Sequence, residues 1–574
     1  MSWRDTAASH VRSLAARFVL VTTVGISVLC AVLAVAFHRY FEFTTSVLIE
    51  PALEADGPLG VLLVLATPTA VFVLLALAIR RLAPRAVGAN LSRVRMAYNG
   101  DTALIGPRSM AATFIATPIS LGAGAPLGPE GPIVVVTSGV AALIARVLRL
   151  PQHLVRGMIP VGVAAGIAAV FNAPMTGVVF ALEEIFGAAH RGLLGGVLVG
   201  AVAAAVVERV LIGGPPILAA PFATWNGAGE LLGFLTVGVI AGVTSGLSIA
   251  AAHRLKRWWG TRMPSMVARA ATAGLLIGAA GLVAPSTLGV GYDSMTYWLH
   301  GGADARVTAI AFIVKTIAFV IAISAGVLGG TFAPSLFIGT ALGAAIGHSA
   351  QVLFPEAHID PKAYAIVGMG SVFAGLLRSP IAAVVIVVEL TRDYELMVPV
   401  MLGVSLAVSI SRRISRLSIV EQQMLDEGHV EESHDPLAAI TAADAMTPDP
   451  AALHSDATVE ETLAVMGPVP HRFYPVVDGD MRLVGIVTRE AATHEQDRQR
   501  RTRELMEQPR LFVRANEPLL EVIKRMQLSG IDRCPVVDAD TTRRVVGFLS
   551  PSDILRARMR STGKEATPGF EFFD

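Results

Sequence analysis

The chain has 574 residues, of which 53% are hydrophobic and 16% are charged, and its mean hydropathy is +0.60. Soluble domains carry about a quarter charged residues, so this composition argues against a soluble enzyme and for a polytopic membrane protein. A net charge of +1 gives no field that attracts nucleic acid, and two cysteines far apart in sequence, Cys30 and Cys534, cannot build a disulfide framework or a metal site.

Long apolar blocks make up most of the chain before Ile410. A helix needs about 20 apolar residues to cross a bilayer; some blocks reach this length, and glycine and proline cut others into pieces of about half of it. We therefore predict well over ten helices, several of them tilted or incomplete. The first block follows Arg4, Arg12 and Arg17, and its length favours a retained helix over a cleaved signal. The blocks are Phe18–Ala36, Gly60–Ile79, Gly131–Leu182, Leu231–Ala252, Ala309–Ile346 and Met397–Ile410.

The composition changes abruptly after Ile410. Arg412, Arg413 and Arg416 end the last apolar block, and positive residues there favour the cytoplasmic side of a membrane. We therefore predict an integral protein of the cell (inner) membrane with an α/β tail in the cytosol. The predicted parts are an N-terminal cytosolic segment 1–17, a membrane domain 18–411 with halves of roughly 18–215 and 229–411, an acidic linker 412–438, two tail modules 439–498 and 505–560, and a final segment 561–574.

An internal repeat indicates how the membrane domain is built. Gly162–Glu184 is similar to Gly368–Leu390, and a break rich in glycine and proline precedes each copy, at Gly128–Pro132 and Gly330–Pro334. Duplicated halves of this kind commonly enclose a substrate site near the middle of the bilayer. The matched residues are Gly162, Ala168, Pro174, Val178, Val179 and Glu183 in the first copy and Gly368, Ala374, Pro380, Val384, Val385 and Glu389 in the second.

Each break is expected to expose a helix start inside the membrane. Pro132 suits a first helical turn, where its missing N–H costs nothing. The helix is therefore expected to begin near Pro132, with free N–H groups and a partial positive charge at Gly131–Val134. Pro334 repeats the design, with the N–H groups of Thr331 and Phe332 exposed ahead of it. Two such helix starts would bind a small anion and release it more readily than a full positive charge would.

Glu130 lies inside the first break. A carboxylate within a membrane is costly and therefore indicates a function. At a helix start it would occupy the place of a permeating anion, and protonation would release it, so we expect Glu130 to be both a gate and a proton carrier. The alternative is a glutamate that only caps the helix, and the matching break in the other half favours the gate.

Glu183 and Glu184 end a long apolar helix. Glu183 has a repeat counterpart, Glu389, which favours a structural role in both halves. Glu184 has none, because Leu390 takes the matching place. Neighbouring helical residues point about 100° apart, so Glu184 faces different surroundings and is a candidate proton entry site. The alternative is a carboxylate that extends to the membrane interface.

These residues resemble the CLC family of chloride channels and chloride/proton exchangers, followed by a pair of CBS domains, over nearly the whole chain. Gly128–Pro132 (GPEGP) resembles the family's GREGP or GKEGP motif, with Pro129 in place of the basic residue. Gly330–Pro334 (GTFAP) resembles its GxFxP motif, and Phe171–Glu184 is also similar to family sequence.

The resemblance implies a polytopic all-α membrane protein with an inverted repeat and broken helices, a cytosolic α/β CBS pair, and a homodimer in which each subunit has its own pore. It also implies that the chain carries chloride or a similar small anion as a proton-coupled exchanger. Glu130 would be the external gating glutamate and Glu184 the internal proton glutamate. The residues that would line the anion path are Gly128, Pro129, Gly131, Gly330, Thr331, Phe332, Val87 and Val420.

Two of these positions depart from the family. The GSGIP motif, whose serine contacts the central anion, has only a degenerate counterpart at Ala86–Asn90, which puts Val87 at the serine. The position of the pore tyrosine falls on Val420. Each lost hydroxyl removes a hydrogen bond worth about 1.5–3 kcal/mol to a charged acceptor. We therefore predict a central site that is weaker, less selective or lined differently, and an inner gate that leaks and lowers proton coupling.

The tail contains a second repeat, in which Tyr474–Arg489 is similar to Cys534–Pro551 and each copy predicts strand, turn and strand. Ser550 and Asp553 fit the CBS pattern in which a serine meets a nucleotide phosphate and an aspartate meets the ribose. The first copy has Ala491 in place of the aspartate. One adenosine nucleotide is therefore the candidate cofactor, and the alternative is a purely structural dimerising module.

Other functions fit the sequence less well. The main alternative is a passive CLC-type channel with weak or no proton coupling, regulated by the tail. A CBS-regulated cation transporter would need rings of Asp or Glu along its pore, and an enzyme would need a motif such as HExxH, GxSxG or a phosphate loop. A nucleotide sensor with an anchor would need only one spanning helix. The predicted partners are the bilayer, chloride or a similar anion, protons and a second copy of the chain, without nucleic acid or metal.

Overall fold

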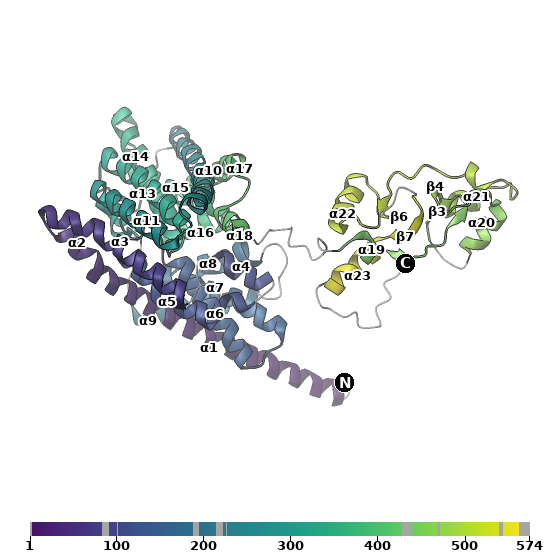
Figure 1. The fold of residues 1–574 in the computed structure, drawn as a ribbon, viewed down its shortest axis with the longest axis horizontal. Coiled ribbons are helices and arrows are strands. Elements are labelled where there is room, and N and C mark those ends of the chain that lie inside the picture. Colours follow the sequence, from purple (N-terminus) through teal and green to yellow (C-terminus); the bar gives the residue numbers. More distant parts are fainter. Residues whose placement is uncertain are drawn as a thin grey trace. The chain divides into compact units, whose positions relative to one another are not determined.

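The computed structural model describes residues 3–82, 91–99, 102–186, 194–213, 218, 222–225, 227–426, 437, 440–467, 471–538 and 543–561. The chain divides into two units, Met1–His429 and Val430–Asp574. The first is helical, and the second combines short strands with helices (Figure 1). The division into a helical membrane part and a small α/β tail is thereby confirmed.

Helices α1 to α18 lie in the first unit. They are α1 (Trp3–Leu48), α2 (Glu50–Glu54), α3 (Gly57–Leu82), α4 (Leu91–Asn99), α5 (Pro107–Gly122), α6 (Glu130–Val147), α7 (Gln152–Phe171), α8 (Pro174–Phe180), α9 (Leu194–Leu211), α10 (Leu231–Arg262), α11 (Met266–Val283), α12 (Tyr292–Leu299), α13 (Ala305–Ala325), α14 (Phe332–Leu353), α15 (Pro361–Leu377), α16 (Pro380–Thr391), α17 (Met397–Ile414) and α18 (Ile419–Asp426). Short 3₁₀ segments are η1 (Thr102–Ile105), η4 (Ala228–Glu230), η5 (Pro285–Thr287) and η6 (Pro355–Ala357), and η2 (Ala181–Phe186) is a π-helical turn.

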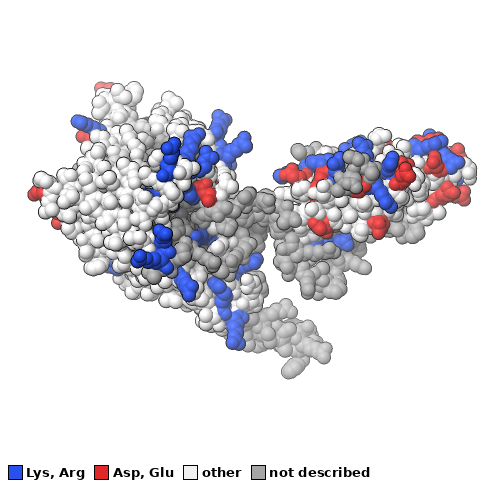
Figure 2. All heavy atoms as spheres, in the orientation of Figure 1, with Lys and Arg blue, Asp and Glu red and all other residues white. Residues whose placement is uncertain are grey.

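Within the described residues, ten helices are long and apolar enough to cross a membrane. Two shorter apolar helices, α15 and α16, join them. Many large apolar side chains of the first unit are exposed, and Figure 2 shows few charged atoms on the visible face of this unit. Lipid, rather than water, suits such a surface. The chain is therefore an integral membrane protein with full and partial spans, as the sequence predicts.

Matched glycines of the membrane repeat lie where helices approach closely. A Cβ at Gly162 of α7 would lie 2.6 Å from the carbonyl oxygen of Thr137 in α6. A Cβ at Gly368 of α15 would lie 2.2 Å from the carbonyl oxygen of Gly339 in α14. Small residues permit such close packing of membrane helices. Helix α6 packs along α7, and α14 packs along α15.

The two copies of the repeat also hold each other through their glutamates. Glu389, at the end of α16, accepts hydrogen bonds from the backbone N–H groups of Met175 (2.9 Å) and Thr176 (2.7 Å), which begin α8. Glu183, beyond the end of α8, accepts bonds from Ile381 (3.2 Å) and Ala382 (2.8 Å), which begin α16. Carboxylates are favourable at helix starts, where N–H groups lack partners. This reciprocal capping is the structural role that the repeat predicts for Glu183.

The second unit contains two small sheets, one of four strands in the order β1-β7-β6-β5 and one of three in the order β2-β3-β4. The antiparallel pairs β3–β4 and β6–β7 each have a register shift at the equivalent position, between Val476 and Val477 in the first pair and between Val536 and Val537 in the second. The tail repeat is therefore also a structural repeat. The elements are α19 (Ala442–Ala445), β1 (Thr447–Pro448), β2 (Leu453–His454), α20 (Val459–Met466), β3 (Phe473–Val477), β4 (Leu483–Thr488), α21 (Arg489–His494), η8 (Thr502–Glu504), β5 (Val513–Arg514), α22 (Leu519–Leu528), β6 (Cys534–Val537), β7 (Val545–Leu549) and α23 (Pro551–Ser561).

Candidate functional site

The two glycine and proline breaks meet at a pair of hydrogen bonds. The backbone N–H of Gly128 donates to the carbonyl oxygen of Gly330 (2.9 Å), and the N–H of Gly330 donates to the carbonyl oxygen of Gly128 (2.6 Å). A Cβ at Gly330 would lie 2.8 Å from the backbone nitrogen of Gly131, so only glycine permits this approach. The bridge joins the starts of α6 and α14, although the two segments are some two hundred residues apart in the chain.

Both helices begin two residues before the proline of their break. Helix α6 starts at Glu130 and α14 at Phe332, so Pro132 and Pro334 each occupy the third helical position rather than the first. The first N–H groups of a helix have no acceptor within it, so a proline is tolerated as far as the third position. Both prolines therefore lie in the first helical turn, as the sequence predicts, and each helix begins two residues before its proline. Glu130 itself is the first residue of α6, and Pro129 is its N-cap.

The Glu130 carboxylate lies across the start of the opposite helix. Its Oε2 accepts a hydrogen bond from the backbone N–H of Ala333 in α14 (3.3 Å), and its Oε1 accepts one from the hydroxyl of Tyr292 in α12. The Glu130 side chain is fully buried. Because helix starts carry partial positive charge, the carboxylate occupies a place that suits an anion. An unsatisfied anion there would be costly, whereas a bound one is stabilised by the same donors.

Aromatic rings cover the start of α14. The ring of Phe332 stacks on Phe171 at a centroid distance of 5.0 Å and meets the edges of Phe180 (5.5 Å) and Phe373 (4.5 Å). These side chains come from both halves of the repeat. Thr331 is the N-cap of α14. Apolar walls lower the local dielectric constant and strengthen the attraction between N–H groups and a charge beside them.

Glu184 is also buried, but in a different backbone setting. It lies in η2, directly after α8, and its Oε1 accepts a hydrogen bond from the hydroxyl of Ser379. Ser379 is the N-cap of α16, and Arg378 before it has a left-handed backbone conformation with a φ of 69°. Glu184 is 4% exposed. Glu183 points to different partners, as the angle between neighbouring helical positions predicts.

Val420 is buried in α18, and this helix is held at both ends. Arg378 donates to the carbonyl oxygens of Ser415 (2.5 Å) and Leu417 (3.2 Å), which precede the helix. At its other end, Asp426 accepts from His253 of α10 (2.8 Å) and also pairs with Lys256 of α10 (3.3 Å). The predicted position of Val87, in contrast, and linker residues 427–436 and 438 lie outside the described residues.

In the tail, Ser550 and Asp553 bind each other. The Asp553 carboxylate accepts hydrogen bonds from the N–H (2.9 Å) and hydroxyl (2.6 Å) of Ser550, from the Thr447 hydroxyl (2.8 Å) and from Arg556. A carboxylate offers about four lone-pair sites, and these contacts use them. The pair caps α23. Nucleotide binding and a structural dimerising module both stay predictions. No cluster of three or more metal-ligating side chains occurs among the described residues.

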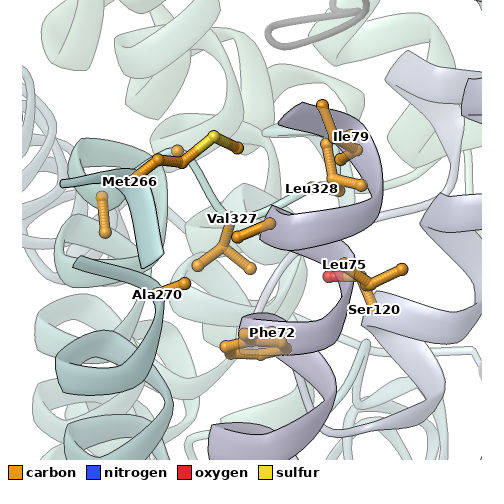
Figure 3. Close-up of a pocket in the computed structure, with 11 residues that line it drawn as sticks. Phe72, Leu75, Ile79, Ser120, Met266, Ala270, Val327 and Leu328 are labelled. Atoms are coloured by element: carbon orange, nitrogen blue, oxygen red, sulfur yellow. The ribbon is translucent and has the colours of Figure 1, made fainter. Parts of the chain in front are cut away.

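A separate apolar pocket lies beside the second break (Figure 3). Ser120 contributes a hydroxyl that has no hydrogen-bond partner among the described residues. The lining is apolar apart from this hydroxyl and includes no charged side chain among the described residues. Its lining residues are Phe72, Leu75, Ala76, Ile79, Ser120, Met266, Ala270, Ala325, Gly326, Val327 and Leu328.

The sequence alone did not identify Tyr292, Ser379 or Lys315. Tyr292 and Ser379 bind the candidate glutamates, and Lys315 binds the loop before Tyr292. Tyr292 and Ser379 each donate to a carboxylate more than 150 residues away. No spacing rule relates such distant positions. Lys315 could have been found from the sequence, because it is the one lysine within the apolar block Ala309–Ile346. A charged residue inside a membrane segment is costly unless it has a partner, so it indicates an interaction.

Comparisons with known proteins agree with this architecture. The family model described as "Voltage gated chloride channel" matches residues 70–412, and the CBS domain model matches residues 442–496 and 503–560. The "Putative chloride channel protein ClcB-like" of Ralstonia nicotianae is 34% identical over 290 residues, which cover 50% of this chain and 67% of that protein. The "H(+)/Cl(-) exchange transporter ClcA" of Salmonella typhi is 30% identical over 331 residues, which cover 56% of this chain and 70% of that protein.

Solved structures share the fold. A slow cyanobacterial Cl-/H+ antiporter superposes with a TM-score of 0.66 at 21% identity, covering 72% of this chain and 98% of that one. A eukaryotic CLC transporter superposes with a TM-score of 0.64 at 20% identity, covering 93% of this chain and 97% of that one. At these identities the likeness concerns the fold, and it extends over most of the chain.

Proposed function

The chain belongs to the voltage gated chloride channel family, and from that premise we propose that it exchanges chloride for protons across a membrane. The single observation that carries this proposal is the Glu130 carboxylate, which accepts the N–H of Ala333 at the start of the opposite helix. A carboxylate and a chloride ion both accept hydrogen bonds from the same N–H groups. An acid that competes with the anion for one place links the movement of the anion to the movement of a proton.

The exchange follows from this competition. While ionised, Glu130 occupies the anion place and blocks it. When an external proton neutralises the carboxylate, its attraction to the helix starts falls, the side chain leaves, and a chloride ion takes the vacated N–H groups. The proton then passes inward to Glu184, whose buried carboxylate is bound by the Ser379 hydroxyl. Return of the ionised Glu130 displaces the anion and completes the cycle.

Several finer features belong to the same proposal. The relatives named as exchangers and the antiporter fold support proton coupling over passive conduction. Arginines at the end of α17, Arg412 and Arg413, support a cytosolic tail because positive residues favour that side. We place the chain in the cell membrane as a homodimer whose subunits each carry one pore. Valine at position 420 supports a less tightly closed inner gate than a tyrosine would give.

Flux measurements on the full chain in liposomes test the proposal. With an outward chloride gradient and no proton gradient, wild-type protein is expected to drive protons inward against equilibrium. Glu130→Gln is expected to keep chloride movement and lose both proton movement and pH dependence. Glu356→Gln, which changes an exposed carboxylate in η6, is the matched control and should behave as wild type. Chloride movement without any proton movement in the wild type would favour the passive channel.

A further inference from the structure

Tyr292 completes the environment of the Glu130 carboxylate. One oxygen of Glu130 accepts the N–H of Ala333, and the other accepts the hydroxyl of Tyr292. A hydroxyl donor binds a carboxylate and a halide alike. Resting on the exchange proposed above, we propose that Tyr292 is the second part of the external gate. Its hydroxyl holds Glu130 in the anion place and donates to the chloride ion once Glu130 has left.

The backbone conformation before Tyr292 directs this side chain toward Glu130. Tyr292 is the first residue of α12, and its N-cap, Gly291, has a φ of 87°, a conformation that glycine adopts readily and other residues avoid. A Cβ at Gly291 would also lie 2.6 Å from ring atoms of Phe337 in α14. The turn therefore requires glycine for two reasons, and it brings the tyrosine to the start of the helix that binds Glu130.

Lys315 fixes the same loop from behind. It lies in α13, it is fully buried, and its ammonium donates to the carbonyl oxygens of Thr287 (3.0 Å), Gly289 (2.6 Å) and Val290 (3.4 Å). These bonds use all three donors of the ammonium. A buried charge is costly unless it is fully hydrogen-bonded, so the lysine and the loop hold each other in one geometry.

The ring of Phe337 joins these parts. The Lys315 ammonium lies over the face of this ring, 4.6 Å from its centroid, where the ring attracts a positive charge. The same ring packs against the Gly291 turn. Lys315 is thus a positioning residue that acts through the loop 287–290, whereas Tyr292 meets the gate itself. The outer site gains a hydroxyl in this way, while the inner end of the pore has valine at position 420.

Chloride binding by the purified full chain, measured by isothermal titration calorimetry, tests the role of Tyr292. In the Glu130→Gln background no carboxylate competes, so Tyr292→Phe removes only a donor to the anion. Chloride affinity is expected to fall about tenfold, as for one lost hydrogen bond to an ion. With Glu130 present, the same substitution also weakens the competitor, so the fall is expected to be clearly smaller. Equal losses in both backgrounds, or none in the Glu130→Gln background, would overturn the proposal.

Two further variants separate gating from folding. Tyr297→Phe changes a tyrosine of the same helix that is 60% exposed, and its chloride affinity should match the parent. Lys315→Met is expected to reduce affinity when Tyr292 is present and to add nothing in the Tyr292→Phe background, with partial recovery in Lys315→Arg. Independent, additive losses would contradict a role that acts through Tyr292.

The outcome is separable from that of the exchange proposal. If the binding cycle appears as described but liposomes show no proton movement, exchange is contradicted and the Tyr292 gate stands. If exchange is coupled but Tyr292→Phe changes affinity in neither background, only the gate is contradicted.

Discussion

Glu130 and Glu184 are two buried carboxylates of the membrane unit, and each accepts a hydrogen bond from a hydroxyl. Their backbone settings differ. Glu130 begins α6 and also binds the start of α14, whereas Glu184 lies in a π-helical turn that follows the end of α8. Helix starts attract negative charge and helix ends do not. In the proposed exchange, Glu130 therefore occupies a place that an anion can take over, whereas Glu184 carries only a proton.

The largest expected effect separates these two roles. Glu184→Gln should reduce proton movement by about a hundredfold, the scale of a lost proton-transfer group, and leave chloride movement nearly intact. Parallel chloride and proton fluxes in liposomes measure both. Ser379→Ala keeps the carboxylate and removes only its hydroxyl partner, so a milder loss is expected. Loss of chloride and proton movement together would show that Glu184 is part of the anion site and erase the distinction.

The next effect concerns the outer site alone. In Gly330→Ala, the new Cβ meets backbone atoms of Gly131 and Gly128, and overpacking of this kind costs about 1–3 kcal/mol. The two helix starts must separate, so chloride flux is expected to fall about tenfold, since 1.4 kcal/mol corresponds to that factor. Gly195→Ala is the control, because a Cβ there meets nothing within 4 Å. Unchanged flux in Gly330→Ala would show that the bridge is not needed.

A smaller effect is expected at Val420, which the proposed exchange places at the inner end of the pore. Val420→Thr adds a hydroxyl at almost constant volume and supplies a donor where the side chain is now aliphatic. A tighter inner gate should raise the proton-to-chloride ratio, by less than the factor of about ten or more that a full hydrogen bond to an ion would give. The ratio comes from reversal potentials under imposed gradients. Val420→Ala, which adds no donor, should leave it unchanged or lower it, and a rise in both variants would argue for a volume effect.

The smallest effect comes from a hydroxyl–carboxylate pair outside the membrane. The hydroxyl and then the backbone N–H of Thr441 hold the pKa of Asp444 below its ordinary value. A lowered carboxyl pKa stabilises the fold at neutral pH, and this contribution is lost as the pH falls through the lowered pKa. Thr441→Ala should therefore lower the calorimetric melting temperature of the tail at pH 7 by a few degrees, with a smaller difference in acid and no change in flux. A difference that grows in acid would contradict the assignment.

Local rules made the outline of the site predictable. The breaks at Gly128–Pro132 and Gly330–Pro334 could be found from glycine, proline and the internal repeat, and so could the unusual place of Glu130. The exact helix starts could not, since a proline is accepted anywhere in the first three positions. Tyr292 and Ser379 lie at helix starts. The local sequence there gives no information about the distant carboxylates that they bind. Such contacts depend on how the halves pack, which no local pattern encodes.

Replacement of chloride by bromide in a crystal of Glu130→Gln tests whether Glu130 and the anion compete for one site, because bromide can be located by its anomalous scattering. A bromide ion is expected within hydrogen-bonding distance of the Ala333 N–H and the Tyr292 hydroxyl, in the place that the carboxylate holds in the wild type. The same soak of wild-type crystals should leave that place to Glu130. Bromide bound elsewhere in the variant, or bound beside an undisplaced Glu130 in the wild type, would contradict competition for one site.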